Sequence, residues 1–340
     1  MKGGDGMRLL LGIIVTAAAL WAGYWVVGAQ AAKTAAAGWF EARRAEGWAA
    51  DYGTMTVQGF PNRFDTVFTD VALADPETGL AWNAPRFQFN TLSYRPDHVI
   101  AVWPDAQRVA TPRAGYDLAS RDMRASLVVT GGTRLALERS TLTADMITIS
   151  PGQANGTSRV ESLTLAAERD RGTIATYRLG LRADGLGPAP RWKARVDPAG
   201  RLPEDFDAFT ADMTVAFDKP WDRTAIEVAR PQPTRIKIRL AEARWGRLEL
   251  QAAGTVDIGA DGRPVGEVTV KARNWRDILD MAVTSGAVPQ GLADTLRDGL
   301  SLVSRMAGNP RTLDIPLGFR NGRVMLGPVP VAAAPVLRLR

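Results

Sequence analysis

The chain has 340 residues, a hydrophobic content of 46%, a charged content of 23% and a formal net charge of +6. These values are typical of a folded protein with a large core, and they argue against a disordered chain and a multi-span membrane protein. The chain contains no cysteine, which excludes disulfides, thiolate nucleophiles and cysteine metal sites.

The N-terminal region contains one long uncharged apolar run, Leu9–Val27, preceded by a short basic head at residues 1–8. At about 1.5 Å per residue, a helix over this run spans roughly 28 Å, close to the thickness of the hydrocarbon core. The basic head favours a cytoplasmic N-terminus. The aromatic residues Trp21, Tyr24 and Trp25 are predicted to lie at the membrane interface on the far side. We therefore expect a single-pass inner-membrane anchor, with the C-terminal domain in the periplasm.

A cleaved signal peptide is the alternative to an anchor, because Ala29–Ala31 offers a small-residue cleavage site. The apolar run is longer than the roughly 7 to 15 residues of a signal sequence, so we favour the uncleaved anchor. Either alternative exports the rest of the chain. Residues 28–50 are rich in alanine and carry Trp39, Phe40 and Trp48 at helical spacing, which predicts a juxtamembrane helix.

From residue 51 the hydrophobic pattern changes to period two, which is typical of β-strands. A cluster of breaker residues at Gly185–Pro190 is the best candidate for a junction. We therefore divide this region into an N-terminal β half, residues 51–187, and a C-terminal β meander, residues 188–340.

The first predicted hairpin contains the run TVQGFPNRFD. Thr54–Gln58 is predicted to form one strand and Arg63–Leu73 the returning strand, with a turn at Gly59–Asn62. In the returning strand, period two places Phe64 and Phe68 on one face. The aliphatic residues expected on the other face are Val67, Val71 and Leu73.

The C-terminal half is more regular. Strict alternation in Arg235–Leu240, Arg247–Gln251, Thr255–Ile258 and Glu267–Lys271 predicts an antiparallel meander. One face of this meander is aliphatic and the other is charged, so the aliphatic face must be covered.

Two amphipathic helices are predicted to provide that cover. Residues 274–284 begin with Asn274 in the N-cap position, and residues 289–306 begin with Pro289. The apolar stripe of the second helix comprises Leu292, Leu296, Leu300, Val303 and Met306. The expected fold is mainly β (α+β): an N-terminal transmembrane helix followed by a large antiparallel β-sheet domain with two packed helices near the C-terminus.

Several short motifs together resemble a bacterial family. They are Gly59–Pro61 with Arg63 and Phe64, Ala216–Trp221, and Gly322–Val324 with Gly327–Pro330. The family is catalogued as domain of unknown function 2125 (DUF2125), whose members often have a second phenylalanine where this chain has Asn62. The resemblance implies an exported, membrane-tethered protein without an established activity, and it supplies no catalytic residues. The meander also looks, more loosely, like the long β-sheets of AsmA-type envelope proteins, which are associated with lipid movement between membranes.

The residues that usually mark an enzyme are missing or isolated. His98 is the single histidine, and the sequence has no Gly-x-Ser-x-Gly elbow, Walker A loop or Gly-x-Gly-x-x-Gly fingerprint. The carboxylates Glu204, Asp205 and Asp207 follow a proline, where solvated or capping roles are expected rather than an acid–base pair. Dispersed basic residues argue against nucleic acid. We predict no enzymatic activity, no catalytic residues, no metal, no cofactor, no nucleotide and no nucleic-acid partner.

The function that these features favour is that of a membrane-anchored periplasmic protein binding lipid or another apolar envelope component. Because ligand sites are mainly apolar, the candidate lipid-binding residues are Phe60, Phe64, Phe68, Phe87 and Phe89. The alternative for these aromatic residues is a hairpin clamped against the core. The alternative function is an envelope interaction scaffold without a ligand, whose charged sheet face docks other proteins and whose aliphatic face is sealed by its own helices.

Overall fold

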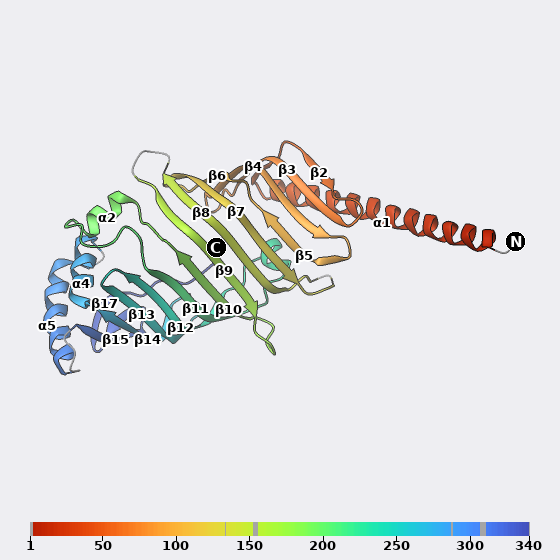
Figure 1. Cartoon of the computed structure of the whole chain (residues 1–340). Coiled ribbons are helices and arrows are strands. Elements are labelled where there is room, and N and C mark those ends of the chain that lie inside the picture. The colour runs from red at the N-terminus through yellow and green to blue at the C-terminus, as the bar shows by residue number, and fades with distance from the viewer. Residues whose placement is uncertain (1–2, 133, 152–155, 287, 307–310, 340) are drawn as a thin grey trace. The chain divides into compact units, whose positions relative to one another are not determined.

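The structure is a computed structural model that describes residues 3–132, 134–151, 156–286, 288–306 and 311–339. It is mainly β, with a long N-terminal helix, many antiparallel strands and helices near the C-terminus, as the sequence predicts (Figure 1). The chain divides into two compact units. Unit 1 comprises Met1–Gly115 with Arg124–Leu127, and unit 2 comprises Tyr116–Met123 with Val128–Arg340. Strand β7 (Gly115–Val129) contributes to both units.

Unit 1 consists of helix α1 (Gly3–Ala45) and an antiparallel sheet. Strand β3 pairs with β1, β2 and β4, and β4 also pairs with β5 and β6. The strands are β1 (Ala49–Asp51), β2 (Met55–Gln58), β3 (Arg63–Ala74), β4 (Ala81–Leu92), β5 (Arg95–Val102) and β6 (Ala106–Ala110). The predicted hairpin at TVQGFPNRFD is therefore formed by β2 and β3.

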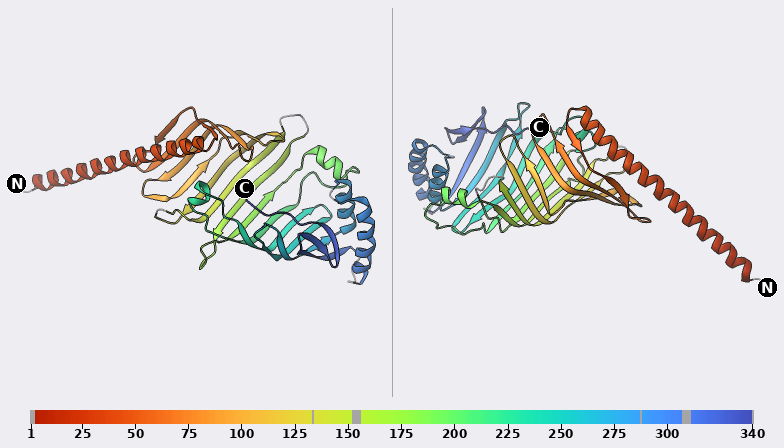
Figure 2. Two further views of the ribbon diagram at one scale, coloured as in Figure 1. Left: turned by 180° about the vertical axis from the view of Figure 1, so that it is seen from behind. Right: turned by 90° about the horizontal axis from the view of Figure 1, so that it is seen from above.

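Helix α1 is continuous, so the predicted anchor and most of the predicted juxtamembrane helix form a single rod. The prediction of helix to residue 50 is wrong at its end, because α1 ends at Ala45, Trp48 follows a turn and β1 begins at Ala49. Its segment Gly6–Ala45 is long and apolar enough to cross a membrane, with a mean hydropathy of 2.0 in its most apolar window. Side chains from residue 6 to residue 21 are exposed, and buried positions appear at Ala29, Phe40 and Arg43. Figure 2 shows the first half of α1 projecting clear of the unit 1 strands while its second half lies against them.

The predicted faces of β3 are correct up to residue 69 and change after it. Asp70 has a positive φ of 51°, in the left-handed region. Beyond it, Val71 and Leu73 pack in the same cluster as Phe68, not on the face of Val67 as predicted. The left-handed residue shifts the alternation by one position, because strict period two requires extended backbone at every residue.

Unit 2 contains a long antiparallel meander in which each strand pairs with the next along the chain. Its strands are β8 (Leu137–Pro151), β9 (Ser158–Arg169), β10 (Thr176–Asp184), β11 (Ala208–Phe217), β12 (Pro233–Trp245), β13 (Leu248–Ile258), β14 (Pro264–Arg273), β15 (Thr312–Arg320), β16 (Arg323–Leu326) and β17 (Val329–Ala333). Short helices α2 (Pro190–Val196) and α3 (Thr224–Glu227) lie in the connections on either side of β11. The junction predicted at Gly185–Pro190 lies inside unit 2.

The two faces of the meander differ as the alternation predicts. One face carries the aliphatic cluster of Val256, Ile258 and Val268, against which Ile236 and Leu337 pack. The opposite face carries ion pairs between neighbouring strands, including Arg235 with Asp257 and Asp212 with Arg178 and Arg239.

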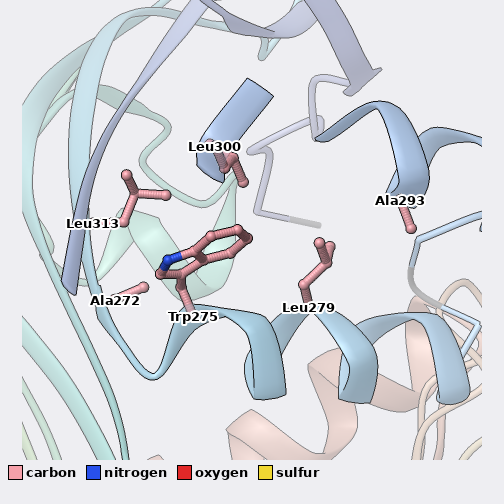
Figure 3. Close-up of a cluster of buried hydrophobic side chains, with 6 residues drawn as sticks. All are labelled: Ala272, Trp275, Leu279, Ala293, Leu300 and Leu313. Carbon is pink, nitrogen blue, oxygen red and sulfur yellow. The ribbon is translucent and has the colours of Figure 1, made fainter. Parts of the chain in front are cut away.

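Helices α4 (Trp275–Thr284) and α5 (Gln290–Met306) cover one end of the aliphatic face, where α4 packs on β13 and α5 on β15. The indole of Trp275 is 2% exposed and is surrounded by Ala272, Leu300 and Leu313 (Figure 3). Leu300 is the one member of the predicted α5 stripe whose side chain is described; the other members, Leu292, Leu296, Val303 and Met306, lie outside the described side chains.

Asn274 occupies the predicted N-cap position of α4, but its side chain does not cap the helix. Its backbone is left-handed, with a φ of 56°, and its Nδ2 donates a hydrogen bond to the carbonyl of Arg247 instead. The sequence pattern identified the position correctly. The role of the side chain is different, because the left-handed backbone turns it toward the β12–β13 connection.

The carboxylate of Asp212 provides a pH test of the unit 2 sheet. It lies 2.8 Å from the Arg178 guanidinium and 2.9 Å from that of Arg239. The hydrogen bond from Arg178, followed by the one from Arg239, lowers the pKa of Asp212 from 3.8 to about 2 against the opposing effect of desolvation. A lowered folded-state pKa stabilises the protein above the unfolded pKa, and this contribution is lost as the pH falls through the folded pKa.

We therefore expect Asp212→Asn to lower the stability of unit 2 at neutral pH and to flatten the loss of stability between pH 3.8 and about pH 2. Urea unfolding of the full chain in detergent, followed by circular dichroism at several pH values, measures both effects. The matched control is Asp145→Asn, at an exposed position on β8. Identical pH profiles for the two variants would contradict the assignment.

Candidate functional site

An apolar cavity of about 600 Å³ lies on the aliphatic face of the unit 2 sheet. This volume falls within the roughly 300–1,000 Å³ of typical small-molecule sites. The wall formed by the strands comprises Leu137 on β8, Ala167 on β9, Tyr177 and Leu179 on β10, Met213, Val215 and Phe217 on β11, and Pro233 and Ile236 on β12. The cavity is therefore built from side chains that are distant in sequence and adjacent in the sheet.

The strand register explains why these side chains meet. Val215 is the partner of both Tyr177 and Ile236, which aligns one row of side chains across β10, β11 and β12. Leu179 is the partner of both Met213 and Ala167, which aligns a second row two residues away. Because residues two apart on a strand share a face, both rows line the same side of the sheet.

One end of the cavity is an aromatic wall. Tyr177 is 1% exposed, and its ring lies 6.0 Å from that of Phe217, which lies 5.6 Å from that of Trp221. The backbone N–H of Trp221 donates a hydrogen bond of 3.2 Å to the Tyr177 hydroxyl. Burial raises the pKa of Tyr177, so the phenol stays neutral at physiological pH. Two of these rings belong to Ala216–Trp221, one of the motifs that the sequence singled out.

The C-terminal tail, residues 334–339, forms another side of the cavity. The N–H of Leu337 donates a hydrogen bond of 2.7 Å to the carbonyl of Gly262. The Gln232 side chain bonds to both backbone groups of Leu339, at 2.9 Å and 3.0 Å. Sequence analysis did not anticipate these tail contacts, since they join residues that are distant in the sequence, as Gln232 and Leu339 are at 107 positions apart.

The five aromatic residues predicted to bind lipid lie in unit 1, where they form most of the junction between the sheet and α1. Phe68 is 2% exposed and packs on Phe40 of α1. Phe64 is half-buried against Tyr24 and Trp25. The remaining members are Phe87, which is half-buried, Phe89, which is 38% exposed, and Phe60, which is 58% exposed. Phe68 and Phe87 thus belong to core packing, Phe64 packs against α1, and Phe60 and Phe89 stay exposed. Lipid contact by any of the five remains a prediction.

The predicted interface residues Trp21, Tyr24 and Trp25 also belong to this junction. Each donates a side-chain hydrogen bond to a backbone carbonyl at a loop of the sheet: Trp21 to Pro61 at 2.9 Å, Tyr24 to Ser93 at 2.6 Å, and Trp25 to Arg63 at 2.8 Å. These residues fix α1 to the loops. Their position at a membrane interface remains a prediction.

The polar residues considered for catalysis have structural partners. His98 Nε2 lies 2.8 Å from the Ser126 hydroxyl. The carboxylate of Glu204 pairs with Lys193, that of Asp205 with Arg159, and that of Asp207 accepts a hydrogen bond from the backbone N–H of Gly246. Across the described part of the chain, no group of three or more His, Asp or Glu side chains is placed to hold a metal ion. The absence of enzymatic activity remains a prediction.

The comparison with protein families gives one match. The family described as "Uncharacterized protein conserved in bacteria (DUF2125)" matches residues 25–335. The chain belongs to this family. The match confirms the resemblance drawn from the sequence motifs. In this DUF2125 protein it includes residues 25–45 of α1 and the strand residues that line the cavity, and it ends before the tail residues Val336–Leu339 that complete the lining. Comparisons with curated proteins and with solved structures gave no match.

The helix–sheet junction can be tested at a glycine. A Cβ atom on Gly28 would lie 2.4 Å from the tip of the Phe64 ring, whereas a Cβ atom on Gly23 would have no neighbour within 4 Å. Alanine within a helix is favoured over glycine by about 0.5–1 kcal/mol, and overpacking costs about 1–3 kcal/mol. We expect Gly28→Ala to destabilise unit 1 and Gly23→Ala to be neutral or slightly stabilising.

Thermal unfolding of the detergent-solubilised full chain compares the two variants. Hydrogen exchange of the amides at residues 60–64 localises the effect. Equal melting temperatures and equal exchange for the two variants would show that α1 does not pack on the sheet at this point.

Proposed function

We propose that this DUF2125 protein is a single-pass membrane protein that holds an acyl chain of a membrane lipid in the unit 2 cavity. The observation that carries the proposal is the apolar cavity of about 600 Å³ in a chain that also has a helix suited to span a membrane. Its mechanism is passive shielding. The sheet provides apolar walls, and each methylene group removed from water contributes about 0.8 kcal/mol.

The lining of the cavity supports a lipid as the occupant. Apart from the Tyr177 hydroxyl, the strand residues of its wall present hydrocarbon and thioether groups. Arg338 on the tail adds one cationic group, whose guanidinium donates a hydrogen bond to the carbonyl of Ala260. Arginine pairs readily with phosphate. Arg338 can therefore bind the phosphate of a lipid headgroup at the edge of the apolar cavity.

The packing of α1 supports an uncleaved membrane anchor over a cleaved signal peptide. Ala29, within the predicted cleavage site, is 8% exposed and lies inside the helix. Cleavage there would remove Trp21, Tyr24 and Trp25, which bond to the loops of the unit 1 sheet. If the basic head lies in the cytoplasm, as its charge favours, the folded units lie in the periplasm, and this location is part of the proposal.

The arrangement of unit 2 favours a ligand over the scaffold function. The scaffold requires a charged face free to dock and an aliphatic face sealed by α4 and α5. These helices pack at β13 and β15, whereas the cavity is lined by β8–β12, the β11–β12 connection and the tail. On the charged face, Asp212 and Asp257 already pair with arginines on neighbouring strands.

Adjacent alanines on β9 test the proposal. Ala167 lines the cavity, whereas its neighbour Ala166 is exposed and points to the opposite face. We expect Ala167→Phe to fill the cavity, to lower the lipid that co-purifies with the full chain, and to weaken binding of the fluorescent fatty acid cis-parinaric acid. Ala166→Phe should leave both unchanged.

The measurements are mass spectrometry of the purified full-length protein after exchange into a lipid-free detergent and fluorescence titration with cis-parinaric acid. A protein that carries no lipid and does not bind the probe would refute the proposal and favour the scaffold. Equal retention of lipid by the two variants would place the lipid elsewhere, most simply around α1.

A further inference from the structure

Two loops of unit 1 lie together at the end of the sheet from which the N-terminal half of α1 emerges (Figure 1). They are the β2–β3 loop, Gly59–Asn62, and the β4–β5 loop, Ser93–Tyr94. The backbone N–H of Ser93 donates a hydrogen bond of 2.8 Å to the carbonyl of Asn62, which joins the loops directly. We call these loops, with the flanking Arg63 and Arg95, the sheet tip.

The sheet tip is fixed at a defined level of α1. Trp21 and Trp25 bond to the carbonyls of Pro61 and Arg63, and Tyr24 bonds to that of Ser93. The Trp25 ring also packs edge-on against Phe60, with ring centroids 5.5 Å apart. The tip therefore lies beside residues 21–25 of the helix, and its depth in a membrane follows from the depth of these residues.

The length of the apolar run sets that depth. The hydrocarbon core is about 30 Å thick, and a helix rises about 1.5 Å per residue, so roughly 20 residues are needed to cross it. Counted from Arg8, the last charge before the run, a crossing of that length ends near Gly28. A typical tilt of about 20° shortens the rise by only a few per cent. Residues 21–25 therefore lie about 5–10 Å before the end of the crossing, which places the sheet tip bonded to them close to the far membrane interface.

The side chains exposed at the sheet tip suit that location. Phe60 is 58% exposed and Tyr94 is 61% exposed, although both are large aromatic residues. The Arg63 side chain is 59% exposed even though it pairs with Asp65 at 2.7 Å, and Arg95 is also exposed. Aromatic rings favour the membrane interface, and arginines extend toward lipid phosphates.

We propose that the sheet tip is a membrane-contacting surface in which Phe60 and Tyr94 insert into the interfacial layer and Arg63 and Arg95 face lipid phosphates. The sheet tip then contacts the bilayer directly, so that unit 1 is held at the membrane surface by its loops as well as by α1. The inference concerns unit 1 and does not rest on lipid binding in the unit 2 cavity.

The absence of cysteine in the chain makes a site-specific test direct. Phe60→Cys, Tyr94→Cys and Asn62→Cys each place a nitroxide label on the sheet tip of the full-length protein. The matched control is Leu80→Cys, which is 48% exposed and lies at the opposite end of β3, in the β3–β4 turn. A label at Val15→Cys, a residue that is 58% exposed and central in the apolar run, reports on the span itself.

The labelled proteins are reconstituted in nanodiscs of phosphatidylcholine and phosphatidylglycerol. Electron paramagnetic resonance then compares collisions with oxygen, which concentrates in the bilayer, and with a water-soluble nickel chelate. We expect the tip labels to collide more with oxygen than with nickel, as the Val15→Cys label does, and the Leu80→Cys label to show the reverse. Tip labels that behave like the Leu80→Cys label would overturn the proposal, whatever the Val15→Cys label shows. The Asn62→Cys variant decides the outcome if either aromatic substitution disturbs the loop.

Discussion

The packing of α1 on the β2–β3 hairpin is the interaction on which the architecture of unit 1 depends. At one end of this junction, Phe40 packs on Phe68 with ring centroids 5.6 Å apart. At the other end, the side chains of Trp21, Tyr24 and Trp25 donate hydrogen bonds to the loops of the sheet. Between them, Gly28 leaves room for the Phe64 ring. A flexible tether would leave the sheet free to rotate about the anchor. A helix fixed along its second half instead transmits its own orientation to the sheet.

Much of this fold could be predicted from the sequence, because the signals involved are local. The apolar run that begins α1, the turn at Gly59–Asn62 and the alternation in Arg235–Leu240 each depend on neighbouring residues, and the structure contains each element. Departures arise where one residue adopts an unusual backbone. Asp70 and Asn274 are both left-handed, and each changes the direction of side chains in a way that periodicity does not encode.

The candidate site was harder to predict, since it depends on register and not on composition. Tyr177, Val215 and Ile236 form one row only because β10, β11 and β12 pair in one alignment, and a shift of one residue would turn them to the opposite face. The motif Ala216–Trp221, which supplies two of the lining residues, was singled out only for the family resemblance and not as part of a site. The docking of the C-terminal tail could not be predicted from the sequence. The tail bonds to Gly262 and Gln232 through its backbone groups, which do not depend on particular side chains of the tail.

The aromatic residues of unit 1 show how one composition can serve different environments. Phe60, Phe64 and Phe68 are spaced four apart and face α1, yet their surroundings change steadily along the strand. Phe68 is buried, Phe64 is half-buried and Phe60 is 58% exposed. The gradient runs toward the end of the sheet that is bonded to residues 21–25. Exposure of a phenylalanine in water is unfavourable, so this gradient is most easily understood if the medium around α1 becomes apolar toward its N-terminus.

The unit 2 cavity raises the converse question of why small side chains line part of the aliphatic face. Void space forfeits dispersion contacts, and larger side chains at small positions would recover them. Ala167 is such a position, since it lies opposite Leu179 in the register and borders the cavity. Helices α4 and α5 cover one end of the face and bury Trp275 and Leu313 to 2% exposure, although an apolar pocket of about 270 Å³ lies between these helices and the sheet. The pocket over β8–β12 and the tail, at about 600 Å³, is the larger of these two and is therefore the part of the aliphatic face to which the proposed occupant is assigned.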